Sequence, residues 1–235
     1  MALTNNLNSW VEEIYKTAFE GRGGNVVPDT DGVTLKDGAV KVDVTFLYAD
    51  LAGSSKLADI CPWNTTAKII RSYLFCAVRL IRLHKGKVRS FDGDRVMGVF
   101  IGNSKNTDAT NCARKIDWTV TNVINPRAKR HFKNISDNSI DIKHCVGVDT
   151  GESRAVRAGI RANNDLIWIG KAPSFAAKLS DIRDYPNEVY ISARVHNRLP
   201  DDAKKPGGQN IWTAKTFKFA GNDETVYGTN YPLEP

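Results

Sequence analysis

The sequence predicts an α+β fold of the split β-α-β type, in which one layer of helices packs on a mostly antiparallel sheet. Two observations support this class. Strand-like segments rich in β-branched and aromatic residues alternate with long segments of helical periodicity, in the order strand, helix, strand, strand, helix, strand. Short turns containing Asp and Gly separate neighbouring strands.

The N-terminal segment begins with an amphipathic pattern that predicts a helix over residues 7–20. Several glycines follow it, and residues 21–39 contain Gly, Pro and Asp without any apolar period. We therefore expect a first region, residues 1–39, made of a helix and a linker. This helix is expected to be an appendage or a dimer-packing element.

The central strand is expected over residues 42–49, and it runs directly into Asp50 and a small polar turn. A long helix over residues 64–84 follows, with its apolar residues along one face. Two short strands then flank the turn Asp92-Gly93-Asp94, which is typical of a hairpin. A second long helix begins near Thr107, and Pro126 is expected to end it.

The second half of the chain is expected to contain further strands and short helices. A strand over residues 140–148 meets a turn at residues 149–151. The remaining expected elements are strands at 155–160 and 166–169, a helix at 172–181, a strand at 188–192, a short helix at 193–199 and a closing strand at 212–220. One domain over residues 40–235 accounts for all of them.

The composition limits the possible partners and locations. The 33 Lys and Arg against 26 Asp and Glu give a net charge of +7, which suits nucleic acid, a membrane surface or a small polyanion such as a nucleoside triphosphate, and does not choose between them. No apolar run is long enough for a membrane span and the N-terminus lacks a signal-peptide pattern, so we expect a cytoplasmic protein without membrane contact. The 4 cysteines lack metal-site spacing and predict buried free thiols. The basic run 127–133 lacks a nucleic-acid-binding signature, so no nucleic-acid partner is expected.

Asp50 and Asp94 are the candidate metal ligands. Two carboxylates brought together from separate strands repel one another unless a cation or a proton lies between them. Oxygen ligands of this kind bind Mg²⁺ or Mn²⁺, and the backbone carbonyl of Leu51 could complete the shell. A purely structural role is also open, in which both residues only stabilise their turns, as Asp often does next to Gly.

Three motifs in register resemble the catalytic domain of class III nucleotidyl cyclases: 46–54 (FLYADLAGS), 93–100 (GDRVMGVF) and 146–151 (VGVDTG). The resemblance implies a ferredoxin-like split β-α-β sandwich that forms a head-to-tail homodimer. It also implies that Asp50 and Asp94 bind two divalent cations, Mn²⁺ or Mg²⁺, which activate the ribose 3′-hydroxyl for attack on the α-phosphate with release of pyrophosphate.

The resemblance also identifies candidate substrate-binding positions. Ser90 stands where purine cyclases carry a Lys that reads the base. The second base-reading position is Ile167 when counted from Gly170; another alignment makes it Leu166 or Asp165. Tyr48, two residues before Asp50, could narrow the base pocket or could be an ordinary core aromatic.

The remaining candidate positions concern the ribose and the phosphates. Ser174 and Lys178 match the family's Asn and Arg, which act on the ribose and on the transition-state phosphate. Because they are four residues apart, they share one helix face. In the family this pair lies opposite the metal ligands of the other protomer. Arg161 matches a phosphate-contacting Arg, although Arg154 and Arg157 are close enough to take that role instead.

The retained aspartates and the missing purine-reading Lys resemble the bacterial pyrimidine cyclases of anti-phage signalling. That resemblance implies conversion of UTP, or alternatively CTP, to a 3′,5′-cyclic monophosphate that activates a separate effector in antiviral defence. The same motifs are also compatible with a purine cyclase that has an unusual pocket, and with a catalytically degenerate nucleotide-binding dimer.

Overall fold

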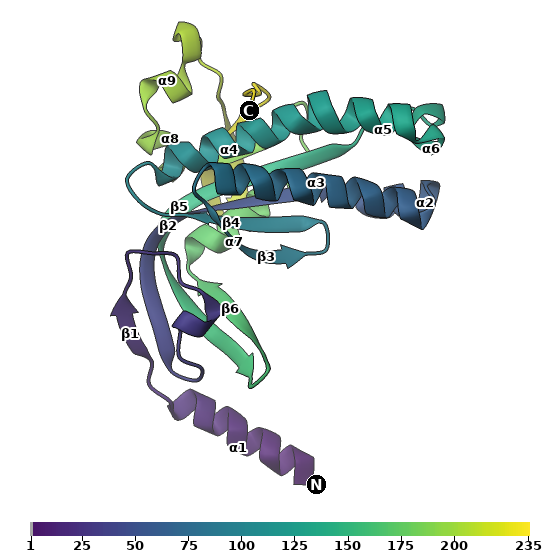
Figure 1. Cartoon of the computed structure of the whole chain (residues 1–235). Helices are drawn as coiled ribbons and strands as arrows, with labels where there is room; N and C mark the ends of the chain where they lie inside the picture. The colour runs from purple at the N-terminus through teal and green to yellow at the C-terminus, as the bar shows by residue number, and fades with distance from the viewer. Residues whose placement is uncertain (1) are drawn as a thin grey trace.

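The computed structural model describes residues 2–235 and shows a twisted sheet with helices on both faces (Figure 1). Its strands are β1 (Glu20–Gly23), β2 (Gly38–Ala52), β3 (Lys87–Asp92), β4 (Arg95–Phe100), β5 (Lys143–Ile160), β6 (Asn163–Ile169), β7 (Val189–Ser192), β8 (Thr213–Phe219) and β9 (Asn222–Thr229). The order across the sheet is β3-β4-β2-β5-β7-β9-β8, with β1 paired to β2 and β6 paired to β5. Only the β1–β2 and β5–β7 pairs among these are parallel, so the predicted mostly antiparallel α+β sheet is confirmed.

The helices lie on both faces of the sheet, which corrects the prediction of a single helical layer. They are α1 (Ala2–Lys16), α2 (Ser54–Ile60), α3 (Trp63–Leu83), α4 (Lys105–Thr119), α5 (Asn125–His131), α6 (Lys133–Asp137), α7 (Lys171–Ser180), α8 (Ala193–Arg198) and α9 (Asp201–Lys204). Helices α3 and α4 cover one face, and α7 packs through Ala172 and Ala176 against Val44 and Phe46 on the other. Strand β2 is apolar on both faces, which is typical of a strand buried between two helical layers.

Strand β5 is continuous through residues 149–151, where the sequence predicted a turn. Its register with β2 runs without interruption from Ala39 paired with Val156 to Ala52 paired with Lys143. Thr150 stabilises the pairing of β5 with β2 at this point, because its hydroxyl lies 2.9 Å from that of Thr45. The separate strands expected at 140–148 and 155–160 are therefore one long strand, because pairing with β2 outweighs the local turn preference of Asp-Thr-Gly.

Pro126 does not end the second long helical segment, contrary to the prediction. Helix α4 passes into a π-helical turn at Val120–Ile124 and then into α5. Pro126 lies in the first turn of α5, where the fixed φ of proline is tolerated. The helix irregularity just before it accommodates the missing N–H.

The N-terminal region is more ordered than a linker. Helix α1 begins at Ala2 and ends at Lys16, earlier than predicted, and β1 then pairs in parallel with the start of β2. Val27 and Val33 are buried, so residues of the expected linker at 21–39 pack against the sheet. The boundary between residues 39 and 40 stays a prediction.

The shorter strands and helices agree with the predictions in part. The predicted hairpin around Gly93 is confirmed as β3 and β4, and the closing strand is confirmed as β8. The sequence patterns did not predict helix α2 or strand β9. The cysteines are free thiols, three buried and Cys76 half-buried, as expected. Among the described residues no helix is both long enough and apolar enough to cross a membrane.

Candidate active site

Strand β2 places Asp50 at its end, on the face of the sheet that α7 covers. The Asp50 side chain is 14% exposed, and its Oδ2 accepts a 2.5 Å hydrogen bond from Nη2 of Arg183. Burial raises the pKa of the Asp50 carboxyl, Arg183 opposes that effect, and the negative charge of nearby Asp94 raises the pKa further. Asp50 is therefore a partly desolvated carboxylate that needs a positive partner to remain ionised.

Asp94 lies beside Asp50 because β2 and β4 pair Asp50 with Arg95, the next residue in the chain. The tight turn at Gly93, which has a φ of +61°, directs the chain from β3 back into β4. Oδ2 of Asp94 is buried and has no hydrogen-bond partner among the described residues. A buried carboxylate oxygen without a partner is costly, so this atom is suited to a ligand that brings positive charge.

The pair fits a divalent cation. Asp50 and Asp94 supply hard oxygen atoms from two strands, which is the ligand chemistry of Mg²⁺ and Mn²⁺. Leu51, whose backbone carbonyl was predicted as a further ligand, follows Asp50 directly in β2. Within residues 2–235 no group of three or more His, Cys, Asp or Glu side chains could hold a metal ion. The protein therefore offers two carboxylates here, with water or substrate oxygens left to complete the shell.

Arg183 was not predicted as a site residue. It lies just after α7, and its Nη1 donates hydrogen bonds of 2.6 Å to the carbonyl of Ser180 and 3.0 Å to that of Ile182. These bonds fix the guanidinium while Nη2 contacts Asp50. The sequence offered no signal for this role, because a basic residue after a helix is an ordinary feature of a helix C-terminus.

Five of the candidate substrate-binding residues line one pocket of 330 Å³: Tyr48, Ser90, Leu166, Ile167 and Ser174. They come from β2, β3, β6 and α7, and the rest of the lining is mostly apolar. Tyr48 is half-buried, and the guanidinium of Arg95 lies 5.6 Å from its ring centroid. The pocket has the size of a small-ligand subsite and contains few polar groups to orient its occupant.

The structure also distinguishes between the three candidate base-reading residues of β6. Leu166 and Ile167 line this pocket, whereas Asp165 does not. The carboxylate of Asp165 instead accepts hydrogen bonds from the hydroxyl of Thr30, at 3.0 Å, and from the backbone of Leu166. Asp165 therefore stabilises the packing of the N-terminal region on β6.

Lys178 and Arg161 do not join this pocket within one chain. Lys178 is on α7, one turn from Ser174, and its Nζ lies 3.3 Å from the carboxylate of Asp181 with the side chain 63% exposed. Arg161 is exposed in the turn between β5 and β6. That turn is at the opposite end of β5 from Cys145, the residue paired with Asp50. A role for Arg161 in phosphate binding would therefore need the Asp50 site of a second copy.

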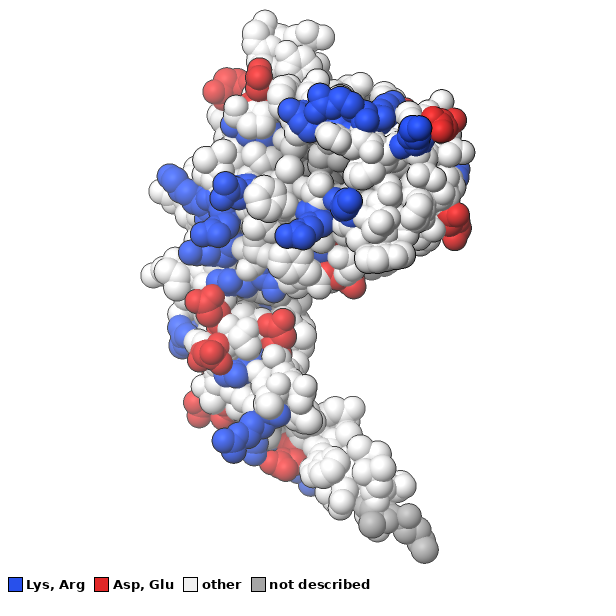
Figure 2. Space-filling model, turned by 45° about the vertical axis from the view of Figure 1, so that its right-hand side comes forward, with Lys and Arg blue, Asp and Glu red and all other residues white. Residues whose placement is uncertain are grey.

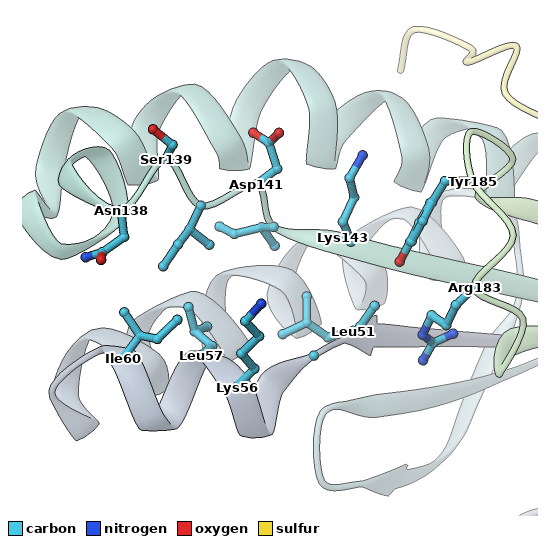
Figure 3. A pocket seen from close by; sticks show the side chains of 14 residues that line it. Leu51, Lys56, Leu57, Ile60, Asn138, Ser139, Asp141, Lys143, Arg183 and Tyr185 are labelled. Atoms are coloured by element: carbon cyan, nitrogen blue, oxygen red, sulfur yellow. The ribbon is translucent and has the colours of Figure 1, made fainter.

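A second pocket, of 490 Å³, opens at the end of β2 (Figure 3). Lys56 from α2 and Lys143 from β5 lie on opposite walls, and the lining also includes Arg183, which contacts Asp50. Asp141 also lines the pocket, but its carboxylate is 2.6 Å from Nζ of Lys129. The lining therefore carries three cationic side chains and one carboxylate, although Lys143 also lies 3.5 Å from Glu188 and Arg183 contacts Asp50. This net positive charge suits an anionic group of a substrate.

Comparison with known proteins identifies relatives across the whole chain. A uridylate cyclase of Rhodovulum sp. (strain MB263) is 38% identical over 100% of this chain and 99% of the relative. A uridylate cyclase of Xanthomonas perforans is 36% identical over 98% of both chains. No family model matches the sequence.

Solved structures share the fold at lower identity. A bacterial light-regulated adenylyl cyclase superposes with a TM-score of 0.67 at 20% identity, over 85% of this chain and 54% of that longer chain. The adenylyl cyclase CyaB from P. aeruginosa gives a TM-score of 0.65 at 14% identity, over 81% of this chain and 95% of that one. The fold is thus that of cyclase catalytic domains. From its full-length similarity to the curated relatives, the chain belongs to the uridylate cyclase family and is a nucleotidyl cyclase, a phosphorus–oxygen lyase.

Proposed function

We propose that the protein converts UTP to 3′,5′-cyclic UMP and pyrophosphate, with Asp50 and Asp94 holding two divalent cations. The observation that carries this proposal is the pairing of a partly desolvated Asp50 with Asp94, whose Oδ2 is buried without a partner. Arg183 contacts only Asp50, so two adjacent carboxylates share one positive partner and further positive charge would stabilise the pair. The curated relatives named uridylate cyclase support UTP as the substrate.

In the reaction, the ribose 3′-hydroxyl loses its proton to solvent and its oxygen forms a bond to the α-phosphorus, while the bond from that phosphorus to the bridging oxygen of the β-phosphate breaks and pyrophosphate leaves. When bound, Mg²⁺ or Mn²⁺ would acidify the 3′-hydroxyl and offset charge on the phosphates. Lys178 supplies a point charge to the developing negative charge, and Ser174 hydrogen-bonds the ribose. The basic pocket with Lys56, Lys143 and Arg183 receives the polyphosphate.

The pocket between Tyr48, Ser90 and Ile167 receives the base. Ser90 cannot reach as far as the Lys of purine cyclases, and Tyr48 limits the depth of the pocket, so the smaller pyrimidine ring is favoured. UTP and CTP differ only in the donors and acceptors on one edge of the base, and a site that leaves one polar group unpaired discriminates by about 1–3 kcal/mol. CTP is therefore the alternative substrate.

The active unit in this proposal is a head-to-tail homodimer. Each site combines Asp50 and Asp94 of one protomer with Ser174 and Lys178 of its partner. This arrangement explains why Lys178, 63% exposed, lines neither the 330 Å³ nor the 490 Å³ pocket of its own chain. The cyclic product acts in the cytoplasm as a second messenger of antiviral defence, through a separate effector.

A substrate lacking the attacking group tests the reaction. The purified protein is incubated with Mn²⁺ and either UTP or 3′-deoxy-UTP, and pyrophosphate and cyclic product are quantified. UTP should give both in equal amounts and 3′-deoxy-UTP neither, with EDTA abolishing turnover. Pyrophosphate release from 3′-deoxy-UTP would indicate hydrolysis and would contradict a cyclase mechanism.

A further inference from the structure

Helix α1 exposes its apolar face to solvent. The large apolar side chains of this face and of the residues after it are exposed: Leu3, Leu7, Trp10, Val11, Ile14, Tyr15 and Phe19. Ile14 is 68% exposed. An amphipathic helix is stabilised chiefly by burying such a face, so α1 lacks the packing that its sequence specifies.

Helix α3 has a complementary feature. One face packs on the sheet through residues such as Ile69, Tyr73 and Ala77. A second apolar face lines an open groove of 620 Å³ whose residues are Ala67, Ile70, Arg71, Leu74, Phe75, Val78 and Phe91. Phe75 is 61% exposed and Phe91 is 58% exposed. A helix with apolar residues on two sides requires a second packing partner.

The two apolar faces have the same spacing and length. On α1 the residues Leu3, Leu7, Trp10 and Ile14 follow intervals of four, three and four, and on α3 the residues Trp63, Ala67, Ile70 and Leu74 follow the same intervals. Each set therefore spans about 17 Å at 1.5 Å per residue. Such spacing produces the ridges and grooves through which two helices pack at a small crossing angle.

The charges of the two helices are also complementary. Helix α1 carries Glu12 and Glu13 against Lys16, a net charge of −1, with Glu12 2.8 Å from Lys16 and Glu13 3.6 Å from Lys36 of its own chain. Helix α3 carries four basic residues and no acidic one: Lys68, Arg71, Arg79 and Arg82. Figure 2 shows Lys and Arg gathered over the helical part of the molecule, whereas the projecting N-terminal helix is largely uncharged on the visible face. Opposite net charges favour α1 against α3 over α1 against a second α1.

Helix α1 cannot reach α3 of its own chain. Only residues 17–19 connect it to β1, which pairs with the start of β2. Three residues span at most about 11 Å. Figure 1 shows α1 projecting from the end of the β2, β5 and β6 strands, away from α3. A contact between them must therefore join two copies of the chain.

We infer that α1 of one protomer docks on the outer apolar face of α3 in a second copy, so that the homodimer exchanges its N-terminal helices. This inference rests on the homodimer in the proposed function and specifies how the two protomers are held together. Helix α1 would then stabilise the dimer without taking part in the cyclase reaction.

Cross-linking between two differently tagged chains tests the contact directly. One chain carries Trp10→Cys and the other Phe75→Cys, both with Cys76→Ser to remove the half-buried thiol on α3. Mild oxidation should produce a mixed-tag disulfide dimer. The control replaces Trp10→Cys with Ser9→Cys, which lies on the face of α1 shared with Glu13 and directed towards Lys36 of its own chain. That control should cross-link much less.

Dimer dissociation measured by analytical ultracentrifugation provides a second readout. Trp10→Glu and Phe75→Glu should each raise the dissociation constant about tenfold or more, as expected for central aromatic contacts, whereas Ser9→Glu should not. Cross-links only between two Trp10→Cys chains, no cross-link in a dimeric sample, or a monomeric protein would each overturn the inference. Because neither readout involves turnover, a mixed-tag cross-link without cyclic product would contradict the proposed function alone.

Discussion

Nη2 of Arg183 lies 2.5 Å from Oδ2 of Asp50, although 133 residues separate the two in the chain. The guanidinium therefore occupies the position next to Asp50 where the proposed function requires a cation. Nη1 of Arg183 donates hydrogen bonds to the carbonyls of Ser180 and Ile182, so the backbone at the end of α7 positions the guanidinium against Asp50. Burial raises the pKa of the Asp50 carboxyl, and Arg183 opposes this effect.

Replacing Arg183 should therefore separate metal binding from turnover. In Arg183→Ala the competing positive charge is gone, and the affinity for Mn²⁺ should rise about fivefold, the factor corresponding to ~1 kcal/mol. The kcat/KM for the nucleotide should fall because the polyphosphate loses a cation. Mn²⁺ titration followed by electron paramagnetic resonance and steady-state kinetics measure the two effects. Weaker Mn²⁺ binding in Arg183→Ala would contradict competition at Asp50. The Mn²⁺ affinity of Arg183→Lys should lie between that of the parent protein and that of Arg183→Ala.

Substitutions of Asp50 and Asp94 should reduce activity far more than a substitution of Asp92, which lies beside Asp94 at the turn between β3 and β4. Asp50→Ala or Asp94→Ala should abolish measurable turnover and Mn²⁺ binding without dissociating the dimer, since each removes a ligand and little core volume. Asp92→Ala is the matched control, because Asp92 is exposed and forms only a 2.8 Å ion pair with Arg95. Its activity should remain within a fewfold of the parent protein. If Asp94→Ala stayed active while Asp92→Ala did not, Asp92 would be the metal ligand.

Mixing two inactive variants tests whether each site is shared. Asp50→Ala and Lys178→Ala should each be inactive alone. In a mixed dimer one site carries both defects and the other carries neither, so about a quarter of the parent activity should return after subunit exchange. No recovery in a sample shown to contain mixed dimers would exclude the trans arrangement.

Asp149 and Asp141 should change the pH dependence of the free energy of unfolding in opposite directions. Burial raises the pKa of Asp149, which Arg194 only partly offsets, so this residue contributes stability below pH 3.8 that is lost as the pH rises through its raised pKa. A hydrogen bond from Lys129 lowers the pKa of Asp141, which contributes stability above pH 3.8 that is lost as the pH falls.

Urea unfolding between about pH 3 and 6 checks these signs. Relative to the parent protein, the free energy of unfolding of Asp149→Asn should rise more steeply with pH, because the variant lacks the stability lost on ionisation. That of Asp141→Asn should rise less steeply. Slopes equal to that of the parent protein in both variants would contradict the opposite pKa shifts of the two carboxyls.

Tyr48 should limit the size of the accepted base. Tyr48→Ala enlarges the 330 Å³ pocket and should improve the kcat/KM for purine relative to pyrimidine nucleotides by about tenfold, a factor that corresponds to ~1.4 kcal/mol. Tyr48→Phe keeps the ring and should keep the preference. An unchanged preference in Tyr48→Ala, with the fold intact by circular dichroism, would assign Tyr48 a packing role only.

The order of the main elements was predictable because helical and strand periodicities are local properties of the sequence. The continuity of β5 was not, since Asp149-Thr150-Gly151 has the composition of a turn and only pairing with β2 holds it extended. The position of α7 on the second face also depends on tertiary packing. The place of Pro126 inside a longer helical segment was not predictable either, because the π-helical turn before it cannot be deduced from residue preferences.

Some residues of the candidate site were also predictable from the sequence, and others were not. Asp50 and Asp94 were predicted from strand-end carboxylates, and the structure places them next to each other at one end of the sheet. Tyr48, Ser90, Ile167 and Ser174 meet in one pocket, although their roles in substrate binding stay predictions. Arg183 could not be predicted because its role depends on where the loop after α7 returns to the sheet.

The most direct test of the central claim is a competition assay with equal concentrations of UTP, CTP, ATP and GTP. The protein is incubated with Mn²⁺, and the cyclic products are identified and quantified by mass spectrometry, with Asp50→Ala as the blank. We expect cyclic UMP as the dominant product, with cyclic CMP as the main minor one. Cyclic AMP or cyclic GMP as the dominant product would contradict it.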